Sequence, residues 1–256
     1  MALLEVKNLK KIYTTRLGGN KVQALDNVNF TVEQGEYVAI MGESGSGKTT
    51  LLNIMASLDR PTAGVVTLAG KNMADIRQKE LCAFRRDNLG FVFQDFNLLD
   101  TLSLKDNILL PLVLAGCDFH SMDERVKPLA AKLDIADLLE KYPYEVSGGQ
   151  KQRTAVARAL ITRPQLVLAD EPTGALDSRS SHMLLDMLEE LNQNLSATIL
   201  MVTHDSFTAS YCRRILFIKD GKIFNEIHRG AKSRKEFFEE IMEVVSVLGG
   251  ETNDRG

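Results

Sequence analysis

Apolar positions along the chain follow two periods, and the two kinds of segment alternate. Short continuous apolar runs such as "YVAIM" (37–41) and "LVLAD" (166–170) have the length of buried strands. Between such runs, apolar residues recur every three or four positions, as in 51–58 and 184–195, which is the period of a helix that buries one face. Alternating strands and helices predict an α/β fold with a largely parallel sheet.

The N-terminal part is predicted to be rich in β-structure. Partial alternation of apolar and polar residues predicts strands over 3–13 and 22–32, with a loop at Gly18–Asn20 between them. A further hairpin is predicted over 61–73, and "LGFVFQ" (89–94) is typical of a short strand.

From Asp95 to about Pro164 the periodicity is helical, with helices predicted near 103–115, 122–140 and 148–162. Because this block interrupts the strand pattern, we interpret it as an inserted helical subdomain.

The C-terminal part returns to strands. The segment 197–205 predicts a strand, and 215–224 predicts a hairpin with a type I′ turn at Asp220-Gly221. In the tail, apolar residues form one helical stripe, which consists of Phe237, Phe238, Ile241, Val244, Val245 and Leu248. Two interpretations of this helix stay open: it packs on its own core, or it is a docking face for a partner.

Composition narrows the class of protein. The chain has 256 residues, of which 44% are hydrophobic and 25% charged, and its net charge of −3 gives no reason to expect nucleic acid as a partner. Cys82, Cys117 and Cys212 lie far apart, so we expect reduced thiols. No apolar run approaches the ~20 residues that span a bilayer, and the first residues do not have the pattern of a signal peptide. We therefore expect a cytoplasmic protein that reaches a membrane only through a partner.

The segment "GESGSGKTT" fits the phosphate-binding pattern G-x-x-x-x-G-K-[ST] between a predicted strand and a predicted helix. Its glycines let backbone N–H groups turn toward a ligand, and the helix start adds a partial positive charge. Lys48 is expected to reach the β- and γ-phosphates, and Thr49 to bind Mg²⁺. The residues expected to contact the nucleotide are Gly42, Glu43, Ser44, Gly45, Ser46, Gly47, Lys48, Thr49 and Thr50.

Acidic and polar residues follow three other predicted strands. Asp170 is expected to hold Mg²⁺ through water, and Glu171 to orient and polarise the attacking water. The alternative for this pair is capping of the helix that follows. His204 could face the γ-phosphate and Gln94 could complete the metal shell, although each could equally be an ordinary strand-end residue.

A second Ser/Gly loop, "VSGGQKQR" (146–153), also opens a predicted helix. It could bind phosphate by the same backbone and helix-dipole logic. Because the first loop already provides a cradle for one nucleotide, the second loop suggests contact with a nucleotide held by another copy of the chain.

Together, "GESGSGKTT", "FVFQ", "VSGGQKQR", "LVLADEP", "GALD" and "MVTHD" resemble the ATP-binding subunits of ABC transporters, in order and spacing, over nearly the whole chain. The resemblance implies a P-loop NTPase (RecA-like) core with an N-terminal antiparallel β subdomain, an inserted helical subdomain, and ATPase activity. It implies that Tyr13 stacks on adenine. The residues implied to act across a dimer are Ser147, Gly148, Gly149 and Gln150 at the γ-phosphate, and the loop that ends in Asp177. The family signature usually starts with Leu, where this chain has Val146.

The implied nucleotide-binding domain covers 1–230, with the core and β subdomain in 1–94 and 161–230, the helical subdomain in 95–160, and a C-terminal helical extension and tail in 231–256.

A narrower resemblance concerns the segments "LGFVFQDFNLLDTLSLKDNILLPL" and "SYCRRILFIKDGKIF" and the tail. They are similar to the branch of macrolide-export, lipoprotein-release and Bce-type antimicrobial-peptide resistance ATPases, and the last two segments to the Bce type in particular. This implies a dimer that uses ATP and Mg²⁺ and works with an FtsX-like integral membrane permease, often together with a sensor histidine kinase, at the cytoplasmic side of the membrane. Its targets would be peptides such as bacitracin or lantibiotics.

Three alternatives stay open: a macrolide-export or lipoprotein-release ATPase, a non-transport ABC ATPase of DNA repair or translation, and a module that holds ATP without hydrolysing it. The chain has one cassette and no long insertion, which argues against the second. Glu171 and His204 argue against the third.

Overall fold

The chain forms two compact units in a computed structural model that describes residues 2–14 and 19–250. Unit 1 comprises Met1–Ala74 and Met201–Gly256, and unit 2 comprises Asp75–Leu200. The subdomain limits expected from the sequence stay a prediction. One residue of the loop expected between the first two strands, Gly18, and the tail after Gly250 lie outside the described residues.

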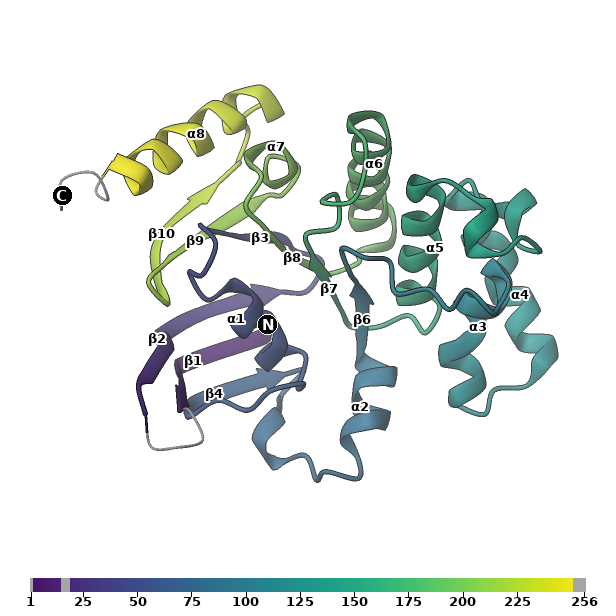
Figure 1. The fold of residues 1–256 in the computed structure, drawn as a ribbon, viewed down its shortest axis with the longest axis horizontal. Helices are drawn as coiled ribbons and strands as arrows, with labels where there is room; N and C mark the ends of the chain where they lie inside the picture. Colours follow the sequence, from purple (N-terminus) through teal and green to yellow (C-terminus); the bar gives the residue numbers. More distant parts are fainter. Residues whose placement is uncertain (1, 15–18, 251–256) are drawn as a thin grey trace. The chain divides into compact units, whose positions relative to one another are not determined.

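Unit 1 contains an antiparallel sheet (Figure 1), which confirms the strands predicted near the N-terminus and the hairpin over 61–73. Val6 pairs with Phe30 on one side and with Val66 on the other, and all three side chains are buried. The strands, in sheet order, are β2 (Lys21–Glu33), β1 (Ala2–Thr14), β4 (Ala63–Leu68) and β5 (Lys71–Asn72).

Each unit also contains strands that pair in parallel. In unit 1, β9 (Arg214–Lys219) pairs antiparallel with β10 (Lys222–His228) and parallel with β3 (Tyr37–Met41), whose five residues are all buried. In unit 2, β6 (Leu89–Val92) pairs parallel with β7 (Leu166–Asp170). Strand β8, Ile199–Thr203, contains the point at which the chain passes from unit 2 to unit 1. Burial on both faces explains why these strands read as continuous apolar runs.

The turn between β9 and β10 has the predicted type I′ geometry. Asp220 and Gly221 have φ values of 48° and 73°, and a type I′ turn requires positive φ at both central residues.

The helices of unit 2 agree with the predicted helical block except in one place. Residue Ser103 caps α3 by accepting a hydrogen bond from the Asp106 N–H at 3.1 Å. The helix expected over 122–140 is wrong in extent, because it ends at Lys132 and Asp134 then adopts a left-handed φ of 49°. Helix α2 was not predicted, since its eight residues are too few to show a clear helical period. The helices are α2 (Leu81–Asn88), α3 (Leu104–Leu114), α4 (Phe119–Lys132), α5 (Gly148–Leu160) and α6 (Ser178–Leu195).

In unit 1, α1 (Lys48–Met55) follows β3, and α7 (Ser206–Ala209) follows β8. The tail forms α8 (Arg234–Gly250), which lies beside α7 in Figure 1. Among the described residues, none of the helices combines the length and the apolar character needed to cross a membrane.

Candidate functional site

The Gly-rich segment forms the turn between β3 and α1. Gly45 and Gly47 have φ values of 82° and 107°, which favour glycine, and within the described residues no side chain caps the start of α1. The buried ammonium of Lys48 donates hydrogen bonds to the carbonyl oxygens of Gly42 and Glu43 at 2.7 and 2.8 Å. An uncapped helix start and a buried cation therefore lie at the same turn, as a phosphate site requires.

Two glycines of this turn also allow close packing of the loop on the rest of unit 1. A Cβ at Gly42 would lie 2.3 Å from the Ile218 carbonyl oxygen, and one at Gly47 would lie 2.6 Å from the Ala24 carbonyl oxygen. The Gly221 N–H donates to the Ser46 carbonyl oxygen at 3.0 Å, so the β9–β10 turn holds the loop. The sequence indicated the loop glycines but not these contacts, which join distant segments.

The loop fits a polyphosphate. The hydroxyl oxygen of Ser46 is buried and has no hydrogen-bond partner among the described residues. A buried hydroxyl without a partner can be satisfied by an anionic oxygen, whereas an apolar ligand would leave it unpaired.

Tyr13 lies near the same helix. Its hydroxyl donates to Asp59 at 2.8 Å. The Asp59 N–H in turn donates to the carbonyl oxygen of Asn53, which lies in α1. The tyrosine is 42% exposed, so its ring is accessible to a ligand. Burial, reinforced by the Asp59 hydrogen bond, raises the pKa of Tyr13, and the hydroxyl stays protonated at neutral pH.

A further functional candidate of unit 1 is His204, which follows the last residue of β8 and is exposed. The next residue, Asp205, accepts hydrogen bonds from the N–H groups of Phe207 and Thr208 and caps α7. This short helix therefore fixes the backbone just after the histidine.

In unit 2, Asp170 ends β7 and Glu171 follows in a left-handed conformation with φ 44°. Such a conformation is uncommon for glutamate and is found preferentially at functional sites. The Glu171 carbonyl oxygen accepts a hydrogen bond from the Gly174 N–H at 2.9 Å, which closes a tight turn after the strand. The acid pair does not cap α6, because Asp177 performs that role.

Gln94 lies close to this turn. A Cβ at Gly174 would lie 2.9 Å from Nε2 of Gln94, so the amide packs directly against this glycine. Gln152, in α5, donates from its side-chain amide to the Phe93 carbonyl oxygen at 3.0 Å and to the Pro172 carbonyl oxygen at 2.7 Å. It therefore connects the residue before Gln94 with the residue after Glu171. Residue type and spacing indicate no role for Gln152, because its place within 146–153 gives no sign of these long-range bonds.

The second Ser/Gly loop forms the N-terminus of α5. Ser147 and Gln150 cap it reciprocally: the Ser147 N–H donates to the Gln150 side chain at 2.9 Å, and the Gln150 N–H donates to the Ser147 hydroxyl at 3.3 Å. A Cβ at Gly149 would lie 2.8 Å from the Ser180 hydroxyl oxygen, so this loop packs against the start of α6. Asp177, which caps α6, accepts from the Ser180 N–H at 2.9 Å and has its pKa lowered by that hydrogen bond.

The structure thus places the predicted site residues in two groups. Unit 1 holds Tyr13, the Gly42–Thr50 loop and His204, and unit 2 holds Gln94, the Ser147–Gln150 loop, Asp170, Glu171 and Asp177. The proposed magnesium ligands, Thr49, Gln94 and Asp170, offer a hydroxyl, an amide oxygen and a carboxylate. These are the hard oxygen donors that Mg²⁺ takes alongside phosphate and water. The roles of all these residues stay a prediction.

Comparison with known proteins identifies the family. The family model described as "ABC transporter" matches residues 25–174. The chain is 51% identical over 254 residues to the bacitracin export ATP-binding protein BceA of Halalkalibacterium halodurans, across 99% of this chain and 100% of that protein. It is 45% identical over 224 residues to the macrolide export ATP-binding/permease protein MacB of Hyphomonas neptunium, across 88% of this chain and 34% of that protein.

A solved structure agrees with the fold. The ATP-binding cassette MJ0796 of Methanocaldococcus jannaschii, as a dimer in a post-hydrolysis state bound to ADP and Pi, has a TM-score of 0.79 and 38% identity, covering 88% of this chain and 98% of that chain. The chain therefore belongs to the ABC transporter family, as one of its ATPases.

Proposed function

We propose that this ATPase powers an FtsX-like membrane permease that exports or detoxifies antimicrobial peptides such as bacitracin or lantibiotics. The observation that carries the proposal is the extent of the match to BceA, which runs over 99% of this chain and 100% of that protein. The match to MacB covers 88% of this chain. It favours a macrolide exporter as the second candidate.

In the proposed mechanism, the chain's own residues bind ATP and move one proton. Lys48 and the N–H groups of the Gly42–Thr50 loop bind the phosphates, and Tyr13 stacks on the adenine. Glu171 accepts a proton from the water that attacks the γ-phosphorus, while ADP leaves, and His204 donates a hydrogen bond to the γ-phosphate. Thr49, Gln94 and Asp170 would hold Mg²⁺, which supplies charge neutralisation on the phosphate oxygens.

The proposed assembly contains two copies of the chain. Each ATP would be bound by the Gly42–Thr50 loop of one copy and by Ser147–Gln150 and Asp177 of the other, and the fit to a dimeric relative supports this arrangement. The permease would recruit the dimer to the cytoplasmic side of the membrane, with a sensor histidine kinase as a further partner. The proposal includes no nucleic-acid partner.

Two variants separate ATP binding from hydrolysis. Lys48→Ala should weaken ATP binding about tenfold or more, because the phosphates lose a charged hydrogen-bond donor. Glu171→Gln should bind ATP normally but hydrolyse it at least about a hundredfold more slowly, because an amide cannot accept the proton. ATP affinity and steady-state hydrolysis are measured with the permease present. A Glu171→Gln protein that hydrolyses ATP at the wild-type rate would contradict the assignment.

The substrate class is tested in cells that lack the chain. The wild-type gene with its permease should restore resistance to bacitracin, and the Glu171→Gln gene should not. Restored resistance to a macrolide, without resistance to the peptide, would overturn the first candidate in favour of the second.

A further inference from the structure

A polar cluster surrounds the hydroxyl of Tyr13. Asp59 accepts a hydrogen bond from Tyr13 at 2.8 Å through Oδ2, and its Oδ1 accepts from the Lys11 ammonium at 2.6 Å and from the Arg60 N–H at 2.7 Å. The Lys11 ammonium also lies 4.7 Å from the centroid of the Tyr13 ring. We call Lys11, Tyr13 and Asp59 the tyrosine cluster.

The backbone around the cluster is held on both sides. The Asp59 N–H donates to the Asn53 carbonyl oxygen at 3.1 Å, which joins this residue to the last turn of α1. Three residues further on, the Thr62 N–H donates to the Lys10 carbonyl oxygen at 2.8 Å, and the Thr62 hydroxyl accepts from the Ile12 N–H at 2.9 Å. The segment after α1 is therefore fixed to the end of β1 immediately beside Tyr13.

Asp59 and Tyr13 keep their protonation states near neutral pH. Partial burial opposes ionisation of Asp59, but hydrogen bonds from Lys11, Tyr13 and the Arg60 N–H outweigh it and lower its pKa. The carboxylate therefore stays an acceptor and the tyrosine hydroxyl stays a donor.

The ion pair between Lys11 and Asp59 is partly shielded from solvent, so it is not expected to add much to the stability of the fold. The Lys11 side chain is 12% exposed and that of Asp59 is 28% exposed, so both charges lose hydration when they pair. Such pairs add little net stability, but they restrict geometry. The cluster therefore fits a role in orientation.

We propose that Asp59 is a positioning residue for purine binding: supported by Lys11, it fixes the plane of the Tyr13 ring on which the base stacks. The inference rests on the proposed role of Tyr13 in binding adenine. Because the Lys11 ammonium covers one face of the ring, the base stacks on the opposite face.

Binding of ADP is compared with binding of inorganic pyrophosphate, which has no base. Both affinities are measured on the full chain by calorimetry, in the same buffer containing Mg²⁺. Where binding is too weak for direct titration, the affinity is measured by competition between the two ligands. Tyr13→Ala should weaken ADP about 5- to 100-fold, the range for loss of a stacked base. Asp59→Asn should weaken ADP about three- to tenfold. Pyrophosphate should change less than about twofold in both variants, since the phosphate loop is untouched.

A double-variant comparison separates positioning from folding. Tyr13→Phe keeps the ring but loses the hydroxyl, so adding Asp59→Asn to it should weaken ADP no further. Glu5→Gln, in an exposed ion pair on the same strand, is the matched control and should leave both ligands unchanged. Melting temperatures are recorded for every variant.

Each contrary result has a distinct meaning. If Tyr13→Ala leaves ADP affinity unchanged, the proposed role of Tyr13 fails, and this inference fails with it. If Tyr13→Ala weakens ADP but Asp59→Asn does not, the inference alone is overturned. Equal losses for ADP and pyrophosphate in Asp59→Asn, or an undiminished loss in the Tyr13→Phe background, would also overturn it.

Discussion

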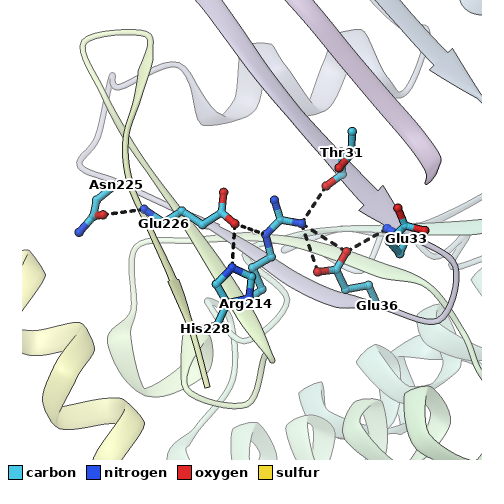
Figure 2. Close-up of polar contacts among 7 residues, drawn as sticks. All are labelled: Thr31, Glu33, Glu36, Arg214, Asn225, Glu226 and His228. Atoms are coloured by element: carbon cyan, nitrogen blue, oxygen red, sulfur yellow. Dashed lines mark hydrogen bonds and ion pairs between the residues drawn. The ribbon is translucent and has the colours of Figure 1, made fainter. Parts of the chain in front are cut away.

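At the scale of single residues, Arg214 joins three segments of unit 1 (Figure 2). Its guanidinium donates to the Thr31 carbonyl oxygen at 2.9 Å, lies 3.2 Å from Oε1 of Glu36, and forms an ion pair with Glu226 at 2.8 Å. His228 contacts the same Glu226 oxygen at 2.8 Å. The arginine side chain is 11% exposed, so its charge depends on these carboxylates for compensation.

This network predicts a pH-dependent contribution to stability. Burial opposes ionisation of Glu226, but the Arg214 guanidinium and His228 outweigh it and hold its pKa below the ordinary 4.5. A lowered carboxyl pKa stabilises the fold fully above about pH 4.5, and the contribution is lost as pH falls through the folded-state pKa. Glu226→Gln should therefore lower the free energy of unfolding by about 1 kcal/mol at pH 7.

The difference in free energy of unfolding between wild type and Glu226→Gln should stay constant from pH 7 down to about pH 5 and shrink as pH falls below about 4.5, as measured by urea denaturation. Glu5→Gln, which removes only a surface ion pair, is the control and should stay within about 0.5 kcal/mol of wild type. A difference that does not shrink below about pH 4.5 would contradict the linkage.

At the scale of elements, the tail helix packs on its own unit. Phe237 and Ile241 are fully buried, and the Arg234 guanidinium lies 4.3 Å from the centroid of the Tyr211 ring. The Lys219 ammonium donates to the Leu248 carbonyl oxygen at 3.1 Å, and cations at a helix C-terminus are favourable. Of the two interpretations of the apolar stripe, the structure favours packing on the core.

Because one face of α8 is buried, we expect two substitutions in this helix to differ greatly in their effect on the free energy of unfolding. Phe237→Ala should lower the free energy of unfolding by about 3–5 kcal/mol, because it leaves a cavity in a fully buried place. Val247→Ala is the control: this side chain is 54% exposed, and its loss should change stability by about 0.5 kcal/mol or less. Chemical denaturation measures both. Equal stability of the two variants would contradict the packing interpretation and favour a docking face.

At the scale of the whole molecule, the proposed dimer predicts complementation. Lys48→Ala damages one side of each composite ATP site, and Ser147→Arg damages the other side. In a mixed dimer, one site carries both changes and the other carries neither. Mixtures should therefore regain part of the ATP-dependent dimerisation that each variant lacks alone, as measured by light scattering in the Glu171→Gln background, where ATP persists.

The Glu171→Gln chain without further changes is the positive control and should dimerise in ATP but not in its absence. The proposal of a composite site is contradicted if this chain stays monomeric in ATP, or if the mixtures dimerise no better than the separate variants.

Much of the fold could be predicted because many of its strands, turns and helices depend on residues that are neighbours in the sequence. Strand β3 was predicted from its continuous apolar run, and the Asp220-Gly221 turn from two residue types that adopt positive φ. The Gly-rich loop was predicted from its glycines, which have no side chain to bury. The helix expected over 122–140 shows the limit. Its apolar period continues past Lys132, but Asp134 takes a left-handed conformation and accepts a hydrogen bond from Arg153 at 2.9 Å, so a distant partner accompanies the break.

The family, the Gly42–Thr50 loop and the acids at the end of β7 could be identified from the residues alone, because they depend on residue type and spacing along the chain. The contacts that hold these residues in place emerge only in the folded chain. Asp59 reaches Tyr13 across 46 positions of the sequence, and Gln152 reaches Phe93 across 59. Aspartate and glutamine are common surface residues, and nothing in their neighbours distinguishes one that supports a site. Their roles follow from which segments the sheets and helices bring together, a property that residue periods along the chain do not contain.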